Sequence, residues 1–295
     1  MVAEENRLIM LTGANGQLGW EIQRRVRHED YSLRALDRHA LDITDAAAVN
    51  AIVDELHPKV IINAAAYTAV DRAEEEPQQA YAVNRDGSEN LARAAREYGA
   101  RLIHVSTDFV FDGGKGSPYR PDDTPAPQCV YGASKLAGEQ AVREILARDA
   151  LIVRTAWVYS SHGGNFVRTM LRLMGSRDAL RVVDDQVGSP TWAGGLAECI
   201  WRAVDIELTG AHHWTDAGVA SWYDFAVAIQ EEALALGLLS RKIPIEPITT
   251  LEYPLPARRP SYSVLGKSAT WQALGYKAPH WRTALRAMLG ELKDA

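Results

Sequence analysis

Short apolar segments alternate with amphipathic ones along the first 160 residues, and this alternation restricts the chain to few folds. Residues 7–12 (RLIMLT), 59–66 (KVIINAAA) and 101–107 (RLIHVST) are apolar runs of strand length. Helical patterns separate them, such as the one over 45–57. Strands that are apolar on both faces favour a parallel sheet covered by helices on either side. The sequence therefore predicts an α/β fold with a Rossmann-type, doubly wound parallel sheet.

The alternation breaks down after about residue 160, where segments such as 184–192 (DDQVGSPTW) and 253–261 (YPLPARRPS) are irregular. We expect one larger domain over 1–160 and a smaller C-terminal lobe over 161–295, with some segments of the lobe returning to the first domain. The remaining expected elements are strands over 33–37 and 150–159 and helices over 17–29, 77–99, 166–173 and 222–236.

Charge and cysteine content exclude several classes of protein. The net charge of −6 gives no support for nucleic-acid binding, which needs a basic face. Two cysteines, Cys129 and Cys199, lack metal or redox spacing and favour a reducing compartment. The N-terminal MVAEENR lacks the pattern of a signal peptide, and no apolar stretch has the length of a membrane helix. We expect a soluble, cytoplasmic protein with no nucleic-acid or membrane partner.

Three glycines follow the first predicted strand at a spacing of three, in TGANGQLG. At a strand-to-helix turn, Gly13 permits the tight turn and Gly16 lets the backbone approach a pyrophosphate. Gly19 lets the helix lie close to the strand, and the helix N-terminus supplies amide donors. The spacing differs from the usual G-x-G-x-x-G, and a loop that simply needs positive φ is the alternative. In its doubly wound context, the loop predicts a dinucleotide site.

Asp37 ends the second predicted strand, where a carboxylate accepts hydrogen bonds from the adenosine ribose. Arg38 follows directly and suits a 2′-phosphate instead, so NADPH and NADH both stay open as the cofactor. In the next loop, the carboxylate of Asp42 and the apolar side chain of Ile43 suit the edge and face of the adenine. The alternative for Asp42 is a turn residue that precedes a helix.

Tyr131 and Lys135 in VYGASKLAGE are four residues apart, which places them on one face of a helix. A phenol has a pKa near about 10, and a neighbouring ammonium lowers it toward the range useful for proton transfer. Thr107 ends the fourth predicted strand and can donate a hydrogen bond to a carbonyl oxygen. A surface tyrosine and lysine are the alternative, but the glycine loop, threonine and Tyr-x-x-x-Lys in this order favour a dehydrogenase.

These residues resemble the extended short-chain dehydrogenase/reductases and, within them, the dTDP-4-dehydrorhamnose reductase family. The segments that carry the resemblance span nearly the whole chain: TGANGQLGWE, ALDITD, INAAAYTAVDRAE, AYAVN, HVSTDFVFDG, VYGASKLAGE, IVRTAWVY, DDQVGSPTW and ARRPSYSVL. The resemblance implies reduction of the C4 ketone of dTDP-4-dehydro-β-L-rhamnose with NADPH or NADH. Hydride passes to the carbonyl carbon, Tyr131 donates the proton, Lys135 holds Tyr131 and the ribose, and Thr107 polarises the oxygen.

The resemblance also implies further site residues. Cofactor contacts are expected from Gln17 and Leu18 besides the glycines, from Asp42 and Ile43, and from the loop residues Ala64, Ala65, Ala66, Tyr67 and Thr68. Thr107 and Asp108 are expected beside the sugar ring, and Trp157 is expected to pack on it, with plain core packing as the alternative. Arg259 of the Arg-Pro pair is expected to bind the diphosphate of the dTDP-sugar, with a solvated surface arginine as the alternative.

Some members of the family form a dimer that Mg²⁺ bridges through glutamates, one of them just after a Pro-Thr pair. Here Gly194 stands at that position, and Glu291 alone cannot make the site. His212 and His213 offer no substitute, because neighbours on a strand point to opposite faces. We therefore expect no metal site, and a homodimer remains open.

Three alternatives compete with the reductase. A dehydratase of this fold needs a second acid after Asp108, where this chain has Phe109. A nucleotide-sugar 4-epimerase uses the same Tyr–Lys pair and keeps NAD bound. A non-catalytic subunit resembling the methionine adenosyltransferase β-subunit shares the fold, although the presence of Thr107, Tyr131 and Lys135 argues for catalysis.

Overall fold

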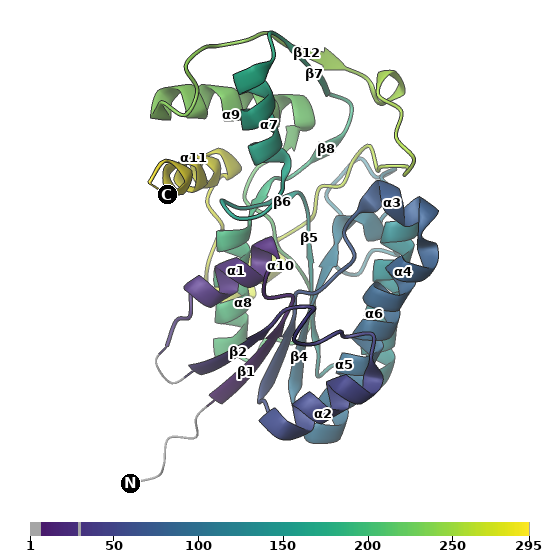
Figure 1. Ribbon diagram of the computed structural model, residues 1–295. Coiled ribbons are helices and arrows are strands. Elements are labelled where there is room, and N and C mark those ends of the chain that lie inside the picture. Colours follow the sequence, from purple (N-terminus) through teal and green to yellow (C-terminus); the bar gives the residue numbers. More distant parts are fainter. Residues whose placement is uncertain (1–6, 29–30, 295) are drawn as a thin grey trace.

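A parallel sheet forms the larger part of the molecule (Figure 1). In the computed structural model, which describes residues 7–28 and 31–294, the order of its six strands is β10-β5-β4-β3-β1-β2. Their bounds are Arg7–Thr12 (β1), Tyr31–Leu36 (β2), Val60–Asn63 (β3), Arg101–Thr107 (β4), Leu151–Thr155 (β5) and Gly210–His213 (β10). Every pairing between them is parallel. The order reverses at β1, and such a switch point is where open α/β sheets bind ligands.

Alternate residues of the strands bury two different helix layers, as the two-residue strand period requires. Ile9 and Leu11 of β1 pack toward α1 (Gln17–Arg24) and α8 (Ala193–Asp205), together with Trp201 of α8. Met10 packs toward the other face, which α2 (Ala46–Leu56), α5 (Gly87–Tyr98) and α6 (Val130–Leu146) cover. Figure 1 shows these layers on the two sides of the sheet. The expected doubly wound architecture is confirmed.

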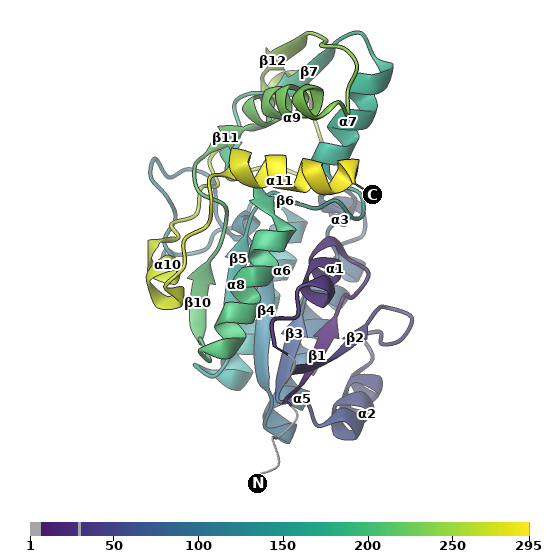
Figure 2. The same cartoon turned by 90° about the vertical axis from the view of Figure 1, so that its left-hand side faces the viewer.

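The smaller lobe packs above the carboxyl ends of the strands (Figures 1 and 2). Its helices are α7 (Phe166–Ser176), α9 (Trp222–Leu236) and α11 (Trp281–Lys293), which enclose an apolar core around Phe225 and Leu285. The lobe also contains short strands: β7 (Leu180–Val183), β12 (Ile245–Ile248), β6 (Val158–Tyr159), β9 (Thr191–Trp192), β8 (Val187–Gly188) and β11 (Ala220–Ser221). Segments α8, β10 and α10 (Ser268–Leu274) return to the sheet, so the lobe is not continuous in sequence.

Several expected elements have different bounds in the structure. The strand expected over 59–66 ends at Asn63, because Asn63 Oδ1 accepts from both Thr12 Oγ1 and the Ala65 amide and turns the chain. The strand expected over 150–159 is interrupted at Trp157, where φ is 48°, and continues as β6. The helix expected over 17–29 ends at Arg24. The strand expected over 33–37 runs from Tyr31 to Leu36, which leaves Asp37 in the following turn.

The helix expected over 77–99 is three segments rather than one. It comprises α4 (Pro77–Tyr81), a π-helical turn (Ala82–Asp86) and α5, and α3 (Val70–Glu75) precedes it. Gly99 closes α5 in the left-handed conformation, as expected. Single π turns are frequent at functional sites because they reorient side chains within a helix.

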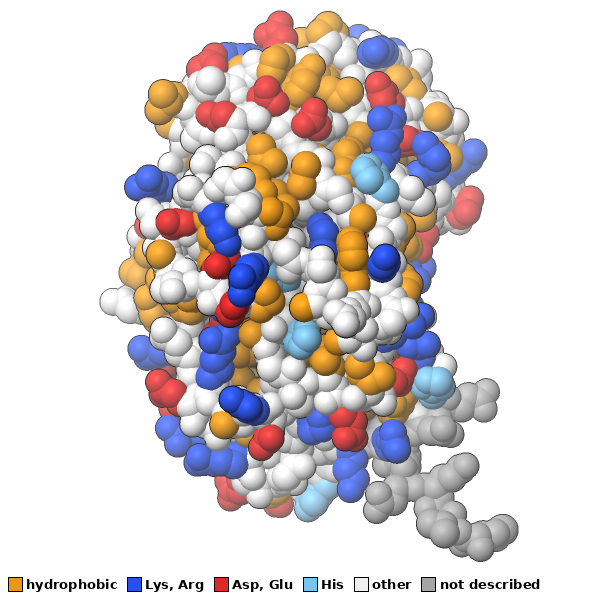
Figure 3. Space-filling view, turned by 180° about the vertical axis from the view of Figure 1, so that it is seen from behind, with side chains coloured by type: hydrophobic (Ala, Val, Ile, Leu, Met, Phe, Trp, Pro, Cys, Tyr) orange, Lys and Arg blue, Asp and Glu red, His pale blue; other side chains and the backbone are white. Residues whose placement is uncertain are grey.

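Basic and acidic side chains are interspersed over most of the rear face (Figure 3). Among the described helices, none combines the length and the apolar character needed to cross a membrane. The N-terminal segment without a signal-peptide pattern lies outside the described residues, apart from Arg7.

Candidate active site

The glycine loop is held against the loop that follows β3. Gly13 has φ 75°, and a Cβ there would lie 2.6 Å from the carbonyl carbon of Ala64. A Cβ at Gly19 would lie 2.2 Å from the Gly13 carbonyl oxygen, so Gly19 brings α1 close to its own loop rather than to the strand. Gly16 is the N-cap of α1. The amides of the first turn, including those of Gln17 and Leu18, have no partner within the helix, as an anion-binding terminus requires.

Several side chains near this turn are already hydrogen-bonded to other residues of the chain or buried by them. Leu18 is buried under the loop, and the Gln17 side-chain oxygen accepts from Asn165 Nδ2 at 3.0 Å. Asp37 accepts from the His39 and Ala40 amides and, at 2.7 Å, from Asn15 Nδ2. These bonds, the Ala40 amide first, lower the pKa of Asp37. The carboxylate is therefore fixed and ionised at the end of β2, where a ribose contact is expected.

Arg38 is exposed and lies 4.0 Å from Asp42. Asp42 Oδ1 accepts from the amide and hydroxyl of Thr44, at 3.0 and 2.8 Å, which lowers the pKa of Asp42. The side chain of Ile43 is buried in the core between β1 and the helices, and it lies so close to Gly87 that a Cβ there would be 2.6 Å from Ile43 Cδ1. The side chain of Ile43 therefore packs mainly in the core, and its contact with the adenine face stays a prediction.

The loop from Ala64 to Thr68 depends on the π-helical turn. Asn84 in that turn accepts from the Tyr67 amide at 2.9 Å and donates to the Tyr67 carbonyl at 3.1 Å. Asn84 Nδ2 also donates to Ser134 Oγ on α6 at 2.9 Å. Ala65 and Ala66 stand half-buried between these anchors. A single buried asparagine thus joins the expected cofactor loop to the helix that carries Tyr131 and Lys135.

Lys135 is 2% exposed, and its Nζ donates to the Val105 carbonyl of β4 at 2.7 Å. Burial lowers the pKa of Lys135 to about 8, and the charge of Glu139 opposes that shift. Glu139 lies one turn further along α6 and accepts from Arg154 at 2.8 and 2.7 Å. The pairing with Arg154 fixes the Glu139 carboxylate in the interior, one turn of α6 from Lys135.

Tyr131 is half-buried at the start of α6, and its ring meets the ring of Phe109 edge-on at 5.5 Å. Desolvation raises the pKa of Tyr131, whereas a hydrogen bond with Thr107 lowers it. The expected lowering by Lys135 is absent from this arrangement, because the ammonium is bonded to Val105. The role of Lys135 in activating the phenol stays a prediction.

Thr107 is the last residue of β4, and Asp108 follows it directly. Thr107 Oγ1 donates to Asp108 Oδ1 at 3.0 Å and accepts from the Phe109 amide at 3.2 Å. Asp108 is 1% exposed, and burial raises its pKa to about 6. Within the described part of the chain, Asp108 Oδ2 has no hydrogen-bond partner. The hydroxyl expected to face a ketone is thus directed at a carboxyl group instead.

Trp157 lies where the chain leaves β5 and enters the lobe. Its indole stacks on Trp222 of α9, with centroids 3.5 Å apart and planes 6° from parallel. A Cβ at Gly188 would lie 2.6 Å from Trp157 Cε2, so only glycine fits beside the ring. A bulky residue at positive φ is rare and marks a position that the surrounding structure holds in place. Trp222 uses one face of the indole, which leaves at most one face for a sugar.

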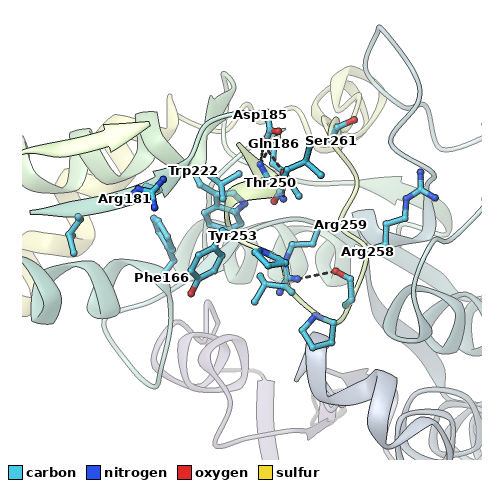
Figure 4. A pocket seen from close by; sticks show the side chains of 18 of the residues that line it. Phe166, Arg181, Asp185, Gln186, Trp222, Thr250, Tyr253, Arg258, Arg259 and Ser261 are labelled. Carbon is cyan, nitrogen blue, oxygen red and sulfur yellow. Dashed lines mark hydrogen bonds between the residues drawn. The ribbon is translucent and has the colours of Figure 1, made fainter. Parts of the chain in front are cut away.

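A cavity of about 750 Å³ opens in the smaller lobe beside this stack. Figure 4 shows Arg181, Phe166, Trp222 and Tyr253 toward one side and Arg258 and Arg259 toward the other. Such a volume is within the range of small-molecule sites. Tyr131, Lys135 and Thr107 are not among the residues that line this cavity.

Arg259 is paired with a side chain of the first domain. Its Nη1 and Nη2 donate to the two carboxylate oxygens of Asp71 on α3 at 2.9 and 2.7 Å, and Nη1 also donates to the Ala257 carbonyl. These bonds use three of the five guanidinium donors. Arg259 therefore lines the cavity as one half of an ion pair with Asp71, and its contact with a diphosphate stays a prediction.

The residues at the expected magnesium position do not fit a divalent cation. A Cβ at Gly194 would lie 2.8 Å from Arg25 Nη2 and 2.7 Å from the Trp192 ring. Glu291 accepts from Arg24 and Arg25 at 2.7 and 3.1 Å, and its carboxylate is therefore already neutralised. The guanidinium groups of Arg24 and Arg25 occupy the space beside the Glu291 carboxylate, where a cation would have to bind.

Comparison of the sequence with known proteins shows the family to which the chain belongs. Residues 7–294 match the family described as RmlD substrate binding domain. The chain belongs to this family. The RmlD-family chain is 42% identical to a dTDP-4-dehydrorhamnose reductase of Aggregatibacter actinomycetemcomitans, over 94% of this chain and 97% of that protein.

Two solved structures resemble the RmlD-family chain. A dTDP-4-dehydrorhamnose reductase of Bacillus anthracis, solved in complex with NADP, is 39% identical with a TM-score of 0.92, and the match covers 97% and 99% of the two chains. The UDP-glucose 4-epimerase of Thermus thermophilus, in complex with NAD, has a TM-score of 0.83 at 20% identity, over 98% and 99%. The second likeness is one of fold alone.

Sequence reasoning missed four residues that organise the site of this RmlD-family chain. Asn84 and Asp71 lie in AYAVN and AVDRAE, segments whose resemblance was noted without a role for these side chains. Trp222 begins a correctly expected helix, but nothing in the sequence indicates its contact with Trp157. Ser263, in the segment after Arg259, faces Asp108 from the smaller lobe.

Proposed function

We propose that this chain is an NADPH- or NADH-dependent reductase that converts the C4 ketone of dTDP-4-dehydro-β-L-rhamnose into dTDP-β-L-rhamnose. The observation that carries the proposal is the position of Tyr131, Lys135 and Thr107 in a chain of this family. All three lie where β4 ends and α6 begins, at the edge of the sheet that the glycine loop shares. The named relatives, dTDP-4-dehydrorhamnose reductases, support the choice of substrate.

The glycine loop fits a dinucleotide. Gly13 and Gly19 lie so close to neighbouring backbone that a side chain would collide with it, and the first turn of α1 points free amides outward. Gln17, Leu18, Asp37, Arg38 and the loop from Ala64 to Thr68 are proposed to hold the cofactor. When bound, the nicotinamide supplies the hydride.

The chain's own residues supply the proton and orient the ketone. Tyr131 is proposed to donate its proton to the alkoxide oxygen that forms at C4, a step worth about 10²–10⁴ in rate. Its pKa, raised by desolvation, keeps that proton in place until the alkoxide forms. Lys135 has one donor on Val105 and, with three donors in all, can reach both the Tyr131 oxygen and a ribose. Thr107 is proposed as the second donor to the oxygen.

The cavity of the smaller lobe is proposed to hold the nucleotide of the sugar. Its apolar end, at Phe166 and Trp222, suits a thymine ring, and its basic end, at Arg259, suits the diphosphate. The deoxysugar would then extend toward Asp108 and the free face of Trp157.

The test is oxidation of NADPH or NADH by the purified protein with dTDP-4-dehydrorhamnose, followed by absorbance at the nicotinamide band. UDP-4-ketosugars serve as controls. Stoichiometric oxidation of the cofactor with the dTDP-sugar supports the proposal, because an epimerase consumes no added cofactor. No oxidation, with binding of the cofactor intact, would favour the non-catalytic subunit. The homodimer stays a prediction, to be tested by the molar mass in solution.

A further inference from the structure

The Thr107 hydroxyl carries one proton, and its hydrogen bonds show where that proton goes. Oγ1 donates to Asp108 Oδ1 at 3.0 Å and accepts from the Phe109 amide at 3.2 Å. A hydroxyl has one donor and two lone pairs. When Asp108 is ionised, Thr107 therefore has no proton for a ketone oxygen. The Tyr131 hydroxyl interacts with the Thr107 hydroxyl, and this contact lowers the pKa of Tyr131.

Asp108 lies in surroundings that favour a neutral carboxyl group. It is 1% exposed, and Oδ2 has no partner within the described part of the chain. Tyr131 faces it from α6, and Ser263 faces it from the segment that bonds to Val187 in the smaller lobe. The nearby ammonium of Lys135 donates to the Val105 carbonyl. Burial raises the pKa of Asp108 to about 6, and the neighbouring hydroxyls of Ser263 and Thr107 oppose that shift.

We propose that Asp108 is a positioning residue that directs the Thr107 hydroxyl, and that its protonated form is the one competent for reduction; this rests on the proposed function. In the acid form, the proton on Oδ1 is donated to Thr107 Oγ1, which also accepts from the Phe109 amide. Both lone pairs of Thr107 are then occupied, so its own proton turns outward. The protons of the Thr107 and Tyr131 hydroxyls are then both available to the C4 oxygen. No bond between heavy atoms changes.

The direction of the pH dependence follows. Below its pKa, Asp108 is protonated and Thr107 is a donor to the substrate; as pH rises through that pKa, the donor is lost. Removing one donor to an oxyanion costs about 10²–10³ in kcat. Wild-type kcat should therefore fall by up to about 10²-fold as pH rises above the pKa of Asp108. The KM for the sugar should change little.

Asp108→Asn is the decisive variant, because its amide N–H₂ can donate to Thr107 Oγ1 at every pH. We expect kcat to remain near the low-pH value of the wild type and to lose the fall with pH. Asp108→Ala, which supplies no donor, is the matched control and should have a kcat about tenfold below that of the asparagine variant. Affinity for NADPH, measured by fluorescence, should be unchanged in both, as in Thr107→Val.

Three results would overturn the inference: an unchanged pH profile in Asp108→Asn, a loss of kcat as large as that of Thr107→Val, or an increase confined to the sugar KM. Ser263→Ala provides a second test that keeps Asp108. Because Ser263 stabilises the ionised carboxylate, its removal should move the fall in kcat to higher pH. An unmoved profile would contradict the proposal, even if the Asp108 variants fail to fold. A wild-type protein that oxidises no NADPH with the ketosugar would instead overturn the proposed function.

Discussion

Two polar clusters in this chain differ in how completely their side chains are paired. Near the end of β4 and the neighbouring β5, four buried polar atoms have no hydrogen-bond partner among the described residues: His104 Nε2, Ser106 Oγ, Asp108 Oδ2 and Thr155 Oγ1. At the junction of α1 and α11, by contrast, the carboxylates are paired. Glu21 accepts from Ser160 and Arg25, and Glu291 accepts from Arg24, Arg25 and Ser161.

An unpaired buried polar group costs about 1–3 kcal/mol, and folded proteins keep few of them. Three of these groups, on Ser106, Asp108 and Thr155, lie at the carboxyl edge of the sheet, which indicates a place where a ligand completes the hydrogen bonds. The paired cluster offers nothing to a ligand and joins the first and last helices of the described chain. Substitutions in the first cluster should therefore change activity, whereas substitutions in the second should change stability.

Tyr131→Phe is the strongest test of the unpaired cluster. It removes the proposed proton donor and keeps the ring against Phe109, so the fold and the affinity for NADPH should be retained. We expect kcat to fall by about 10²–10⁴ with little change in KM. Steady-state kinetics with the dTDP-ketosugar measure this loss. Activity equal to that of the wild type would remove Tyr131 from the chemistry.

Arg259 is intermediate between the two clusters, since it is paired with Asp71 but lines the cavity. If it also contacts the diphosphate, a charge-assisted bond of about 1.5–3 kcal/mol is lost in Arg259→Ala, which raises the sugar KM roughly 10- to 150-fold. Affinity for NADPH should not change. The exposed neighbour provides a control: Arg258→Ala should alter the sugar KM less than Arg259→Ala does. A loss confined to NADPH affinity would place the diphosphate elsewhere.

Asp37 and Arg38 should give a smaller effect, because Arg38 is exposed, Asp37 is only partly buried, and solvent screens both charges. Asp37 repels a 2′-phosphate and Arg38 attracts it. An exposed charge pair is worth about 0.2–1 kcal/mol, which corresponds to roughly 1.4- to 5-fold. Asp37→Ala should shift the ratio of kcat/KM toward NADPH by that factor, and Arg38→Ala should shift it toward NADH. If neither variant changes the ratio, the end of β2 does not discriminate between the two cofactors.

The sequence predicted the parallel sheet, the glycine turn and the helix of Tyr131 and Lys135, because local periodicity and backbone geometry determine them. It did not predict that Thr107 donates to Asp108 or that Arg259 pairs with Asp71. The second contact joins residues 188 apart in the chain, and no pattern along the sequence encodes such a distance. The π-helical turn was also missed, since its effect depends on Asn84 meeting Tyr67 and Ser134 in space.

The carboxylates at the junction of α1 and α11 are already paired, so we expect chelators to change neither activity nor stability. EDTA should leave both kcat and Tm unchanged, because guanidinium groups already neutralise Glu21 and Glu291. Glu21→Ala should instead lower stability. Its side chain is fully buried, but its partner Arg25 is 27% exposed, so we discount the usual 3–5 kcal/mol for a broken buried pair to about 2 kcal/mol. For a chain of this size, that lowers Tm by about 4–8 °C, with kcat retained. A fall in Tm or activity with EDTA that MgCl₂ reverses would show that a cation binds here after all.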